Sequence, residues 1–406
     1  MLLFKLAFRN IFRQKRRSLL TGLSMAGGYI LCALSFSTTE GSYNNVINLF
    51  TLDHSGHVQI HKGNYLQQPK TFTLIEHPEK ISQTLDEHEK VVSHTLRVYA
   101  PVLAYSETGN SPAKLIGVDV GREKQTSRLY EKVKSGTYLS EKTDKNGYFP
   151  ALIGKGISRS LSLSLGDELV LISQGADGSI ANDIFIISGI VGNKDSMDKN
   201  NIFIPLQAAQ YFLSMPNQIH EIAILLNSPN ESRDVSINLQ VLFPNLTVSP
   251  WEVVEETFYK SMQSDKAGNR VGLLIIIFIV FIGVLNTVLM SVLERTREFG
   301  VIKAIGTRPI IVAKLITLET TILATMSSLV GLVLSVPIIA WFTYVGIELK
   351  NPIDMGGILF SRMTGELSPY VFGMPMIIII FSALVISIFP GIKAAKILPT
   401  EAMRSH

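Results

Sequence analysis

Four apolar segments, each close to or beyond the length needed to cross a bilayer, restrict this chain to a membrane-anchored fold. They are residues 18–38, 271–293, 315–345 and 370–390, and a spanning helix needs about 20 predominantly apolar residues. Only 17% of the residues are charged, below the roughly 25% that is usual in soluble domains. We therefore expect four transmembrane helices.

A long polar stretch separates the first two of these segments. Residues 40–270 carry 26 acidic and 21 basic side chains, which is too polar for a membrane but ample for one or two folded domains. Strand patterns at 91–105 and 114–120, an Asp177-Gly178 hairpin signal, and helical patterns at 78–86 and 231–242 indicate mixed structure. We expect an α-helical membrane anchor of four transmembrane helices with a large mixed α+β extracytoplasmic domain, residues 39–270, inserted between helices 1 and 2.

Basic residues near the ends of the apolar segments predict the orientation. Residues 1–17 contain six basic residues and no acid, and residues 294–314 contain five basic residues, whereas 346–369 contain two. Cytoplasmic loops are enriched in Lys and Arg. We therefore expect 1–17, the 294–314 loop and the tail 391–406 in the cytoplasm, with 39–270 and the short loop 346–369 outside.

The first 17 residues predict an amphipathic helix. Phe4, Phe8, Ile11 and Phe12 fall on one face, so this helix can lie in the cytoplasmic interface against anionic lipid. A plain positive flank to the first span is an equally open interpretation. Cleavage of the segment as a signal peptide is disfavoured, because its apolar part exceeds the usual 7–15 residues.

The loop between the second and third spans has an unusual pattern. It reads E-R-T-R-E-F-G-V-I-K-A-I-G-T from Glu294 to Thr307. An apolar side is expected from Phe299, Val301, Ile302 and Ile305, and a charged side from Arg295, Arg297, Glu298 and Lys303. Gly306 and Pro309 are typical of a helix end and of the start of the next helix.

This loop closely resembles the corresponding segment of the FtsX-type ABC permeases, the family that includes the LolC/LolE and MacB types. Residues 390–404 resemble the family's closing P-x-x-x-A-A-x-x-x-P-x-E-A-x-R, and residues 151–171 and 202–213 resemble its extracytoplasmic core domain. The resemblance implies a multi-pass protein of the bacterial inner membrane, with the large domain in the periplasm or outside. It also implies a membrane-proximal part formed by both ends of the insert and a distal part at about 115–218; a single undivided domain stays open.

The resemblance further implies that a soluble ATPase of the LolD or MacB type docks on the loop. The implied coupling residues are Glu294, Arg295, Arg297, Glu298, Phe299, Gly300, Ile302, Ala304 and Gly306. ATP and Mg²⁺ are expected on that partner, because residues 1–406 contain no G-x-x-x-x-G-K-[ST] phosphate loop. The Gly154-Lys155-Gly156 triplet is expected to be a turn that begins a helix, and the chain is expected to hold no cofactor and no catalytic residue.

Three further polar features have competing explanations. His54, His57 and His61 lie close together, but they lack further ligands, so we expect a solvated strand edge rather than a metal site. Asn286, with Gly283 on the same span, is expected to serve helix packing rather than a transport pathway. Glu319 is expected to pair with Lys314 or to reach towards the membrane surface.

The favoured function is that of a permease subunit that transmits ATP-driven motion to its periplasmic domain. Lipoprotein release is the favoured purpose, because the chain looks closest to the LolC/LolE group. Efflux of a peptide or drug, and a non-transporting FtsX-like regulator of cell-wall hydrolases, are the alternatives; a sensor is weakened by the lack of a cytoplasmic output domain. Four helices cannot enclose much of a pathway, so a second permease chain, identical or different, is expected. Membrane lipid and a lipoprotein or periplasmic partner are further expected contacts, and nucleic acid is not.

Overall fold

The computed structural model describes residues 2–13, 15–193, 196–355 and 358–398 of the chain. They form two compact units. The helical unit comprises the described residues within 1–44, 262–350 and 362–406, and the inserted domain comprises 45–261 together with 351–361. Residues 399–406 of the predicted cytoplasmic tail, and the side chain of His54, lie outside the described part.

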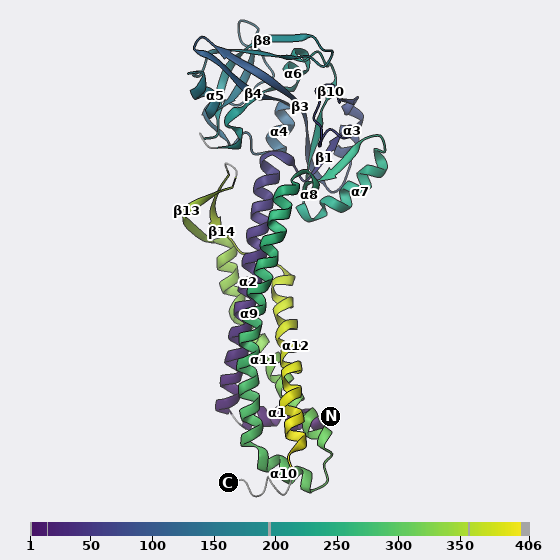
Figure 1. The fold of residues 1–406 in the computed structure, drawn as a ribbon, viewed down its shortest axis with the longest axis vertical. Helices are drawn as coiled ribbons and strands as arrows, with labels where there is room; N and C mark the ends of the chain where they lie inside the picture. The colour runs from purple at the N-terminus through teal and green to yellow at the C-terminus, as the bar shows by residue number, and fades with distance from the viewer. Residues whose placement is uncertain (1, 14, 194–195, 356–357, 399–406) are drawn as a thin grey trace. The chain divides into compact units, whose positions relative to one another are not determined.

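Six helices run through or into the helical unit (Figure 1). They are α1 (Leu2–Arg13), α2 (Lys15–Phe50), α9 (Glu256–Glu294), α10 (Thr296–Ala304), α11 (Pro309–Tyr344) and α12 (Pro369–Lys396). Among the described residues, α2, α9, α11 and α12 are long and apolar enough to cross a membrane. Each predicted apolar segment coincides with the apolar part of one of them, and the helices continue into polar sequence because nothing there breaks them.

A short hairpin that the sequence pattern did not predict follows α11. Its strands are β13 (Ile347–Met355) and β14 (Ile358–Met363), which pair with each other and with no other strand of the described residues. Residues 346–369 are therefore more than the simple loop that we expected. The next helix, α12, begins after Ser368, whose side chain accepts a hydrogen bond from the backbone N–H of Val371, as an N-cap serine typically does.

Small residues let the spanning helices approach closely. A Cβ added to Gly28 on α2 would lie 2.6 Å from a methyl group of Val280 on α9. A Cβ added to Gly331 on α11 would lie 2.8 Å from the ring of Tyr29 on α2. The Tyr29 hydroxyl donates a 2.9 Å hydrogen bond to the carbonyl oxygen of Phe372 on α12. Packing of this kind stabilises helices in lipid, where no hydrophobic effect drives them together, and it brings α2 against all three other spans.

The far ends of α2 and α9 also pair. Within the inserted domain, Phe50 and Phe258 stack with ring centroids 4.1 Å apart and planes inclined by 17°. Within the helical unit, Asn269 donates a 3.1 Å hydrogen bond to the Tyr43 hydroxyl, and Lys266 lies 4.9 Å from the centroid of the Tyr43 ring. The two helices that connect the units along the chain therefore contact each other in both.

The inserted domain is built on a ten-stranded sheet (Figure 1) in the order β12-β1-β11-β3-β4-β9-β6-β8-β5, with β7 pairing to β3 and β8. The strands are β1 (Val58–His61), β3 (Val91–Ser106), β4 (Gly109–Val118), β5 (Val133–Gly136), β6 (Phe149–Gly154), β7 (Glu168–Gln174), β8 (Ile180–Val191), β9 (Asn201–Pro205), β11 (Glu221–Leu226) and β12 (Thr247–Pro250). A separate pair is formed by β2 (Ile75–Glu76) and β10 (Gln218–Ile219). The domain is mixed, as the sequence predicted.

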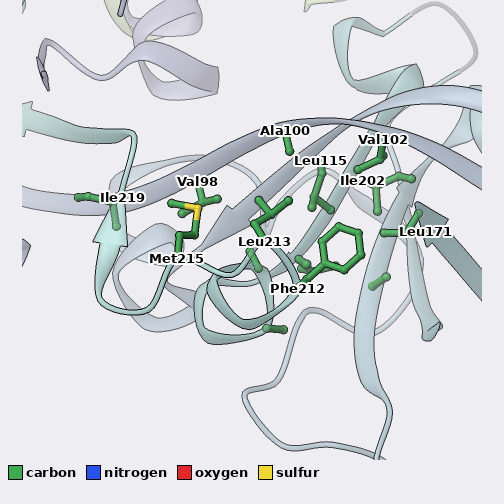
Figure 2. Close-up of a cluster of buried hydrophobic side chains, with 14 of the residues drawn as sticks. Val98, Ala100, Val102, Leu115, Leu171, Ile202, Phe212, Leu213, Met215 and Ile219 are labelled. Atoms are coloured by element: carbon green, nitrogen blue, oxygen red, sulfur yellow. The ribbon is translucent and has the colours of Figure 1, made fainter. Parts of the chain in front are cut away.

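Helices cover the sheet at several positions. They are α3 (Pro78–Asp86), α4 (Val120–Thr126), α5 (Lys155–Ser160), α6 (Leu206–Phe212), α7 (Ser232–Leu242) and α8 (Trp251–Val254), with short turns η1 (Thr51–Ser55), η2 (Met197–Asn200) and η3 (Pro229–Glu231). Figure 2 shows Phe212 and Leu213, at the end of α6, packed against Leu115 of β4 and Ile202 of β9. All four side chains are almost fully removed from solvent, so this cluster is part of the core that holds α6 on the sheet.

Strand connectivity explains how the long insert folds as one body. The first strand of the insert, β1, lies between β11 and β12, which belong to the C-terminal end of the insert. Both pairings are antiparallel. The long strand β3 pairs with β11, β4 and β7. The Asp177-Gly178 hairpin joins β7 to β8, with Gly178 at φ +87°, which confirms the hairpin expected from that dipeptide.

His61, at the end of β1, and His57, directly before that strand, are buried, contrary to our expectation of a solvated strand edge. His57 and His61 are 3% and 1% exposed, because β1 is an interior strand with neighbours on both sides. The Nδ1 atom of His57 accepts a 3.0 Å hydrogen bond from the backbone N–H of Leu226. In the same way, the Nδ1 atom of His220 accepts one from the backbone N–H of Tyr99 at 3.0 Å. Only a neutral imidazole ring can accept such a bond.

We expect acid to destabilise the inserted domain between pH 6.5 and 4. Burial lowers the pKa of His57, His94 and His220 from 6.5 to about 4 in each case. In that window the unfolded chain binds protons that the folded chain does not, so stability is fully present above pH 6.5 and is lost as the pH falls towards 4. While it titrates, each histidine lowers the free energy of unfolding by up to about 1.4 kcal/mol for every unit by which the pH falls.

Hydrogen exchange of the intact protein in detergent checks this expectation. Protection factors of amides in β1, β3 and β11, corrected for intrinsic rates, should fall between pH 7 and pH 5, while those of α11 and α12 should change less. A His220→Gln variant should show a weaker fall, because the amide oxygen of glutamine can accept the Tyr99 bond without titrating. Equal protection at both pH values would contradict the expectation.

Candidate functional site

The short helix α10 lies between two spans and has sharply defined ends. It begins at Thr296, with Arg295 alone separating it from the end of α9 at Glu294, and it ends at Ala304. Gly306 adopts φ +96°, a conformation in which an L side chain is strained. Pro309 is then the first residue of α11. The predicted helix, its end close to Gly306 and the start of the next helix at Pro309 are all confirmed.

One face of α10 is buried in the helical unit. Phe299 is fully buried and Gly300 is also buried, and Phe299 belongs to the cluster that contains Val292 of α9 and Val312 of α11. Ile302, three residues further on, packs against the same cluster. This spacing places these residues on one side of a helix, which fixes how α10 is rotated on the rest of the unit.

The opposite face of α10 and the turn after it form an exposed strip, defined here as Arg297, Val301, Ala304, Ile305 and Arg308, all of which are exposed. Val301 is 47% and Ile305 is 79% exposed, so the prediction that they share one apolar side with Phe299 and Ile302 was wrong. The reason is geometric: residues 297, 301 and 305 repeat every four positions, on the side away from 299 and 302. Among the described residues, Arg297 and Arg308 form no ion pair, and the strip therefore presents both apolar surface and free positive charge.

Arg295 anchors the start of α10 through two carboxylates. It is only 6% exposed. It donates hydrogen bonds to Glu298 at 3.0 Å and to Glu319 of α11 at 2.8 Å, and its guanidinium lies 4.9 Å from the centroid of the Phe299 ring. The partner of Glu319 is thus Arg295 rather than Lys314, which is exposed. A buried arginine with two carboxylate partners is well compensated, whereas loss of one partner is costly.

The N-terminal helix α1 joins the same network. Asn10 donates a 2.6 Å hydrogen bond to the second carboxylate oxygen of Glu319, and Arg13 pairs with Glu298. Ala7 and Ile11 on α1 are buried, whereas Phe4, Phe8 and Phe12 are 44–55% exposed on another side. The predicted aromatic face is therefore available for the membrane interface, although Ile11 lies on the buried side.

Two further contacts attach α10 and its neighbours to the surrounding helices. Arg17 on α2 lies 3.7 Å from the carboxylate of Glu294 at the end of α9. Lys303 donates hydrogen bonds to the backbone carbonyl oxygens of Ala395, at 2.7 Å, and of Ile397. These carbonyls lie at the C-terminal end of α12, where a cation is favoured by the helix dipole. The helix α10 is thus attached to α1, α11 and α12, with one face left open.

The structure therefore separates the predicted coupling residues into two groups. The first group holds α10 in place and consists of Arg295, Glu298, Phe299, Gly300 and Ile302. The second group is exposed: Arg297 and Ala304 face outwards, Gly306 lies in the turn after α10, and Glu294 pairs with Arg17 of α2. Sequence reasoning missed Asn10 and Arg13, and for Glu319 it offered Lys314 or the membrane surface instead of Arg295. A carboxylate inside an apolar span signals that Glu319 needs a partner, but the sequence does not say which side chain supplies it.

The predicted packing residues of α9 differ in their surroundings. A Cβ added to Gly283 would lie 3.4 Å from the hydroxyl of Ser24 on α2, so Gly283 faces a neighbouring helix. Asn286 is exposed and has no hydrogen-bond partner among the described residues. Its role in helix packing stays a prediction.

The described residues contain no group of three or more His, Cys, Asp or Glu side chains placed to hold a metal ion. Gly154 ends β6 and precedes α5, as expected for a glycine at the start of a helix. A Cβ on Gly154 would lie 2.0 Å from the carbonyl oxygen of Asp198, so close backbone approach explains this glycine.

Comparisons with protein families match two parts of the chain. Residues 18–240 match the MacB-like periplasmic core domain, and residues 270–399 match the FtsX-like permease C-terminal region. The second match contains α10, the exposed strip and most of the ion network, although Asn10 and Arg13 lie before the first match.

Characterised relatives are distant but cover most of the chain. The lipoprotein-releasing system transmembrane protein LolE of Haemophilus influenzae is 22% identical over 325 residues, which are 76% of this chain and 77% of that protein. LolC of Xylella fastidiosa is 23% identical over 315 residues, 73% of each chain. The macrolide export ATP-binding/permease protein MacB of Bdellovibrio bacteriovorus is 24% identical over 294 residues, 68% of this chain and 42% of that protein.

Proposed function

Because this chain belongs to the FtsX-like permeases that carry a MacB-like periplasmic core domain, we propose that it drives lipoprotein release from the inner membrane. It is a multi-pass membrane protein and a non-catalytic transmembrane subunit of an ABC transporter, and permeases of this family work with ABC ATPase subunits. In the proposal, the chain pairs with a second permease chain and passes motion from the ATPase to the inserted domain.

The observation that supports ATPase docking is the exposed strip on α10. A partner interface needs apolar contact area and a few well-placed charges, and arginine is enriched among the residues that contribute most. The strip supplies Val301 and Ile305 for contact and Arg297 and Arg308 for pairing with acidic groups. The orientation predicted from the basic residues places it on the cytoplasmic side.

The observation that supports transmission of motion is the attachment of α10 on its other sides. Arg295 connects it to α11 and Lys303 connects it to the end of α12. A rigid-body displacement of α10 would therefore move these helices as well. Directly before α10, α9 is an uninterrupted helix of 39 residues, about 58 Å long at 1.5 Å per residue, and its first residues belong to the inserted domain.

The substrate class is supported by the LolE and LolC relatives, because each is similar over roughly three quarters of this chain. Efflux is the second candidate, since the MacB relative is a macrolide exporter that also matches 68% of the chain. An assay of the purified complex in proteoliposomes separates the two. Lipoprotein release predicts ATP-dependent transfer of an acylated protein from the bilayer to a soluble acceptor, whereas efflux predicts ATP-dependent movement of a drug or peptide.

We expect Arg297→Glu to weaken binding of the ATPase subunit by roughly tenfold or more, because central interface arginines contribute 1.4 kcal/mol or more. Val301→Asp should have a comparable effect, since it places a charge in the apolar part of the strip. Both side chains are exposed, so neither change should alter membrane insertion or the thermal stability of the permease. Co-purification and titration of the ATPase onto the permease in nanodiscs measure the effect.

The matched control is Lys393→Glu, which reverses an exposed charge on α12 outside the strip. It should bind the ATPase as the unmodified chain does. If Arg297→Glu and Val301→Asp also bound normally, the ATPase would dock elsewhere and this part of the proposal would be wrong.

A further inference from the structure

A cavity of about 900 Å³ lies within the inserted domain. Its walls come from β1, β3, β4, β9 and β11, from the segment between β1 and β2, and from residues just before α9. This volume is in the range of pockets that hold drug-sized ligands. Nothing in the proposed coupling mechanism uses it.

Two ion networks form part of the wall, of which the one around Arg97 is fully buried. Arg97 pairs with Glu123 at 2.7 Å and with Glu221 at 3.2 Å. Lys132 pairs with Asp53 at 3.0 Å and with Asp198 at 2.8 Å. Each network joins one cation to two carboxylates. Burial alone would raise the pKa of Glu221, but its hydrogen bond with His61 and the charge of Arg97 lower it to about 2, so it stays ionised.

One carboxylate in the wall has no cation beside it. Glu255 is half-buried in the cavity, and its side chain forms no ion pair or hydrogen bond among the described residues. Burial and the nearby charge of Glu221 raise its pKa, which is the physical sign of a carboxylate that lacks a compensating positive group.

Two fully buried polar atoms beside the cavity also lack partners. The hydroxyl of Ser55 and the Nδ1 atom of His61 make no hydrogen bond within the described structure, although both residues line the cavity and are no more than 2% exposed. The Nε2 atom of His61 is 3.3 Å from Glu221, so a neutral ring that donates there leaves Nδ1 as an acceptor. Unsatisfied buried polar atoms are uncommon and are often explained by a missing ligand or water.

The remaining wall suits an apolar or aromatic body. Leu66, Ile116, Leu129 and Phe203 line it. Tyr65 stacks on His61, with ring centroids 5.4 Å apart, and offers an aromatic surface near the acceptor atoms. The ring of Tyr99 already holds the Lys114 ammonium at 4.3 Å from its centroid.

We propose that this cavity binds an amphipathic organic amine, with its ammonium group against Glu255 and its apolar body along the wall that contains Leu66 and Phe203. The lining carries five acidic and four basic side chains, namely Asp53, Glu123, Asp198, Glu221, Glu255, Lys70, Arg97, Lys114 and Lys132. A monovalent cation therefore balances the set. An ammonium also donates hydrogen bonds, as His61 Nδ1 and the Glu255 carboxylate require, and charge-assisted bonds of this kind are the strong ones.

The test uses the full chain in lipid nanodiscs with dansylcadaverine, a fluorescent amphipathic amine, after subtraction of binding to empty nanodiscs. We expect saturable binding that weakens by about tenfold in Glu255→Gln, because that variant removes the charge and keeps the shape. Ala113→Phe, which fills part of the cavity, should also weaken it. The matched control, Glu256→Gln, changes the adjacent exposed carboxylate and should bind as the unmodified chain does.

Two related probes define the charge requirement. N-acetyl dansylcadaverine, which is neutral, and anilinonaphthalene sulfonate, which is an anion, should bind at least tenfold more weakly than the amine. Equal binding of the anion, or normal amine binding by Glu255→Gln, would overturn the proposal. Because the assay contains neither ATPase nor lipoprotein, its result is independent of the function proposed above.

Discussion

Replacing Arg295 with methionine is expected to destabilise the helical unit by about 3–5 kcal/mol, the usual effect of removing one member of a buried ion pair. The change leaves Glu319 at a side-chain exposure of 12% with only the Asn10 amide as a partner, and it removes the link between α10 and α11. We also expect ATP hydrolysis by the bound ATPase to lose its dependence on substrate. Thermal unfolding in detergent and ATPase assays in nanodiscs measure the two effects.

A double replacement distinguishes stability from transmission. Arg295→Met combined with Glu319→Leu removes both charges, so no buried carboxylate is left uncompensated, and most of the lost stability should return. The dependence of ATP hydrolysis on substrate should stay impaired, because the ion pair that joins the start of α10 to α11 is then absent. An Arg295→Met protein as stable as the unmodified chain would show that the network is unimportant, whereas full coupling in the double variant would show that it serves stability alone.

The second large effect is expected at Arg97, in the inserted domain. Arg97→Met should unfold the domain or lower its stability by at least 3 kcal/mol, because it leaves Glu123 and Glu221 buried without their shared cation. Arg97→Lys should recover only part of the loss, since an ammonium cannot reproduce the forked contact of the guanidinium with two carboxylates. Protease resistance of the domain in the full-length protein reports the effect.

A matched control for Arg97 is available in the same domain. Arg159 on α5 is exposed, and Arg159→Met should leave protease resistance unchanged. If Arg97→Met and Arg159→Met behaved alike, the buried network would not be the element that stabilises the domain, and the prediction would be wrong.

Local sequence patterns predicted much of the framework. The apolar segments, the helix at 78–86, the Asp177-Gly178 hairpin and the end of α10 near Gly306 each depend on residues close together in the chain. Periodicity, turn chemistry and helix-end preferences act over such short distances. The family resemblance added the role of the 294–314 loop, which composition alone did not supply.

The contacts that define the sites could not be predicted in this way. Asn10 and Glu319 are 309 positions apart, and Arg97 and Glu221 are 124 apart, so only the folded structure brings them together. The rotation of α10 was also ambiguous, because Phe299 and Ile302 on one side and Val301 and Ile305 on the other are all apolar. Packing against α9 and α11 decides which pair is buried, and a single helix pattern contains no information about those neighbours.

The position of β1 between β11 and β12 has an evolutionary consequence. The strand with which the inserted domain begins, β1, and the strand near its end, β12, are neighbours in one sheet. The inserted domain is therefore a unit whose two ends lie side by side. Recombination could exchange such a unit between related transporters while requiring only that two helix ends match. The helical unit and its contacts around α10 would then be unchanged while the inserted domain is replaced.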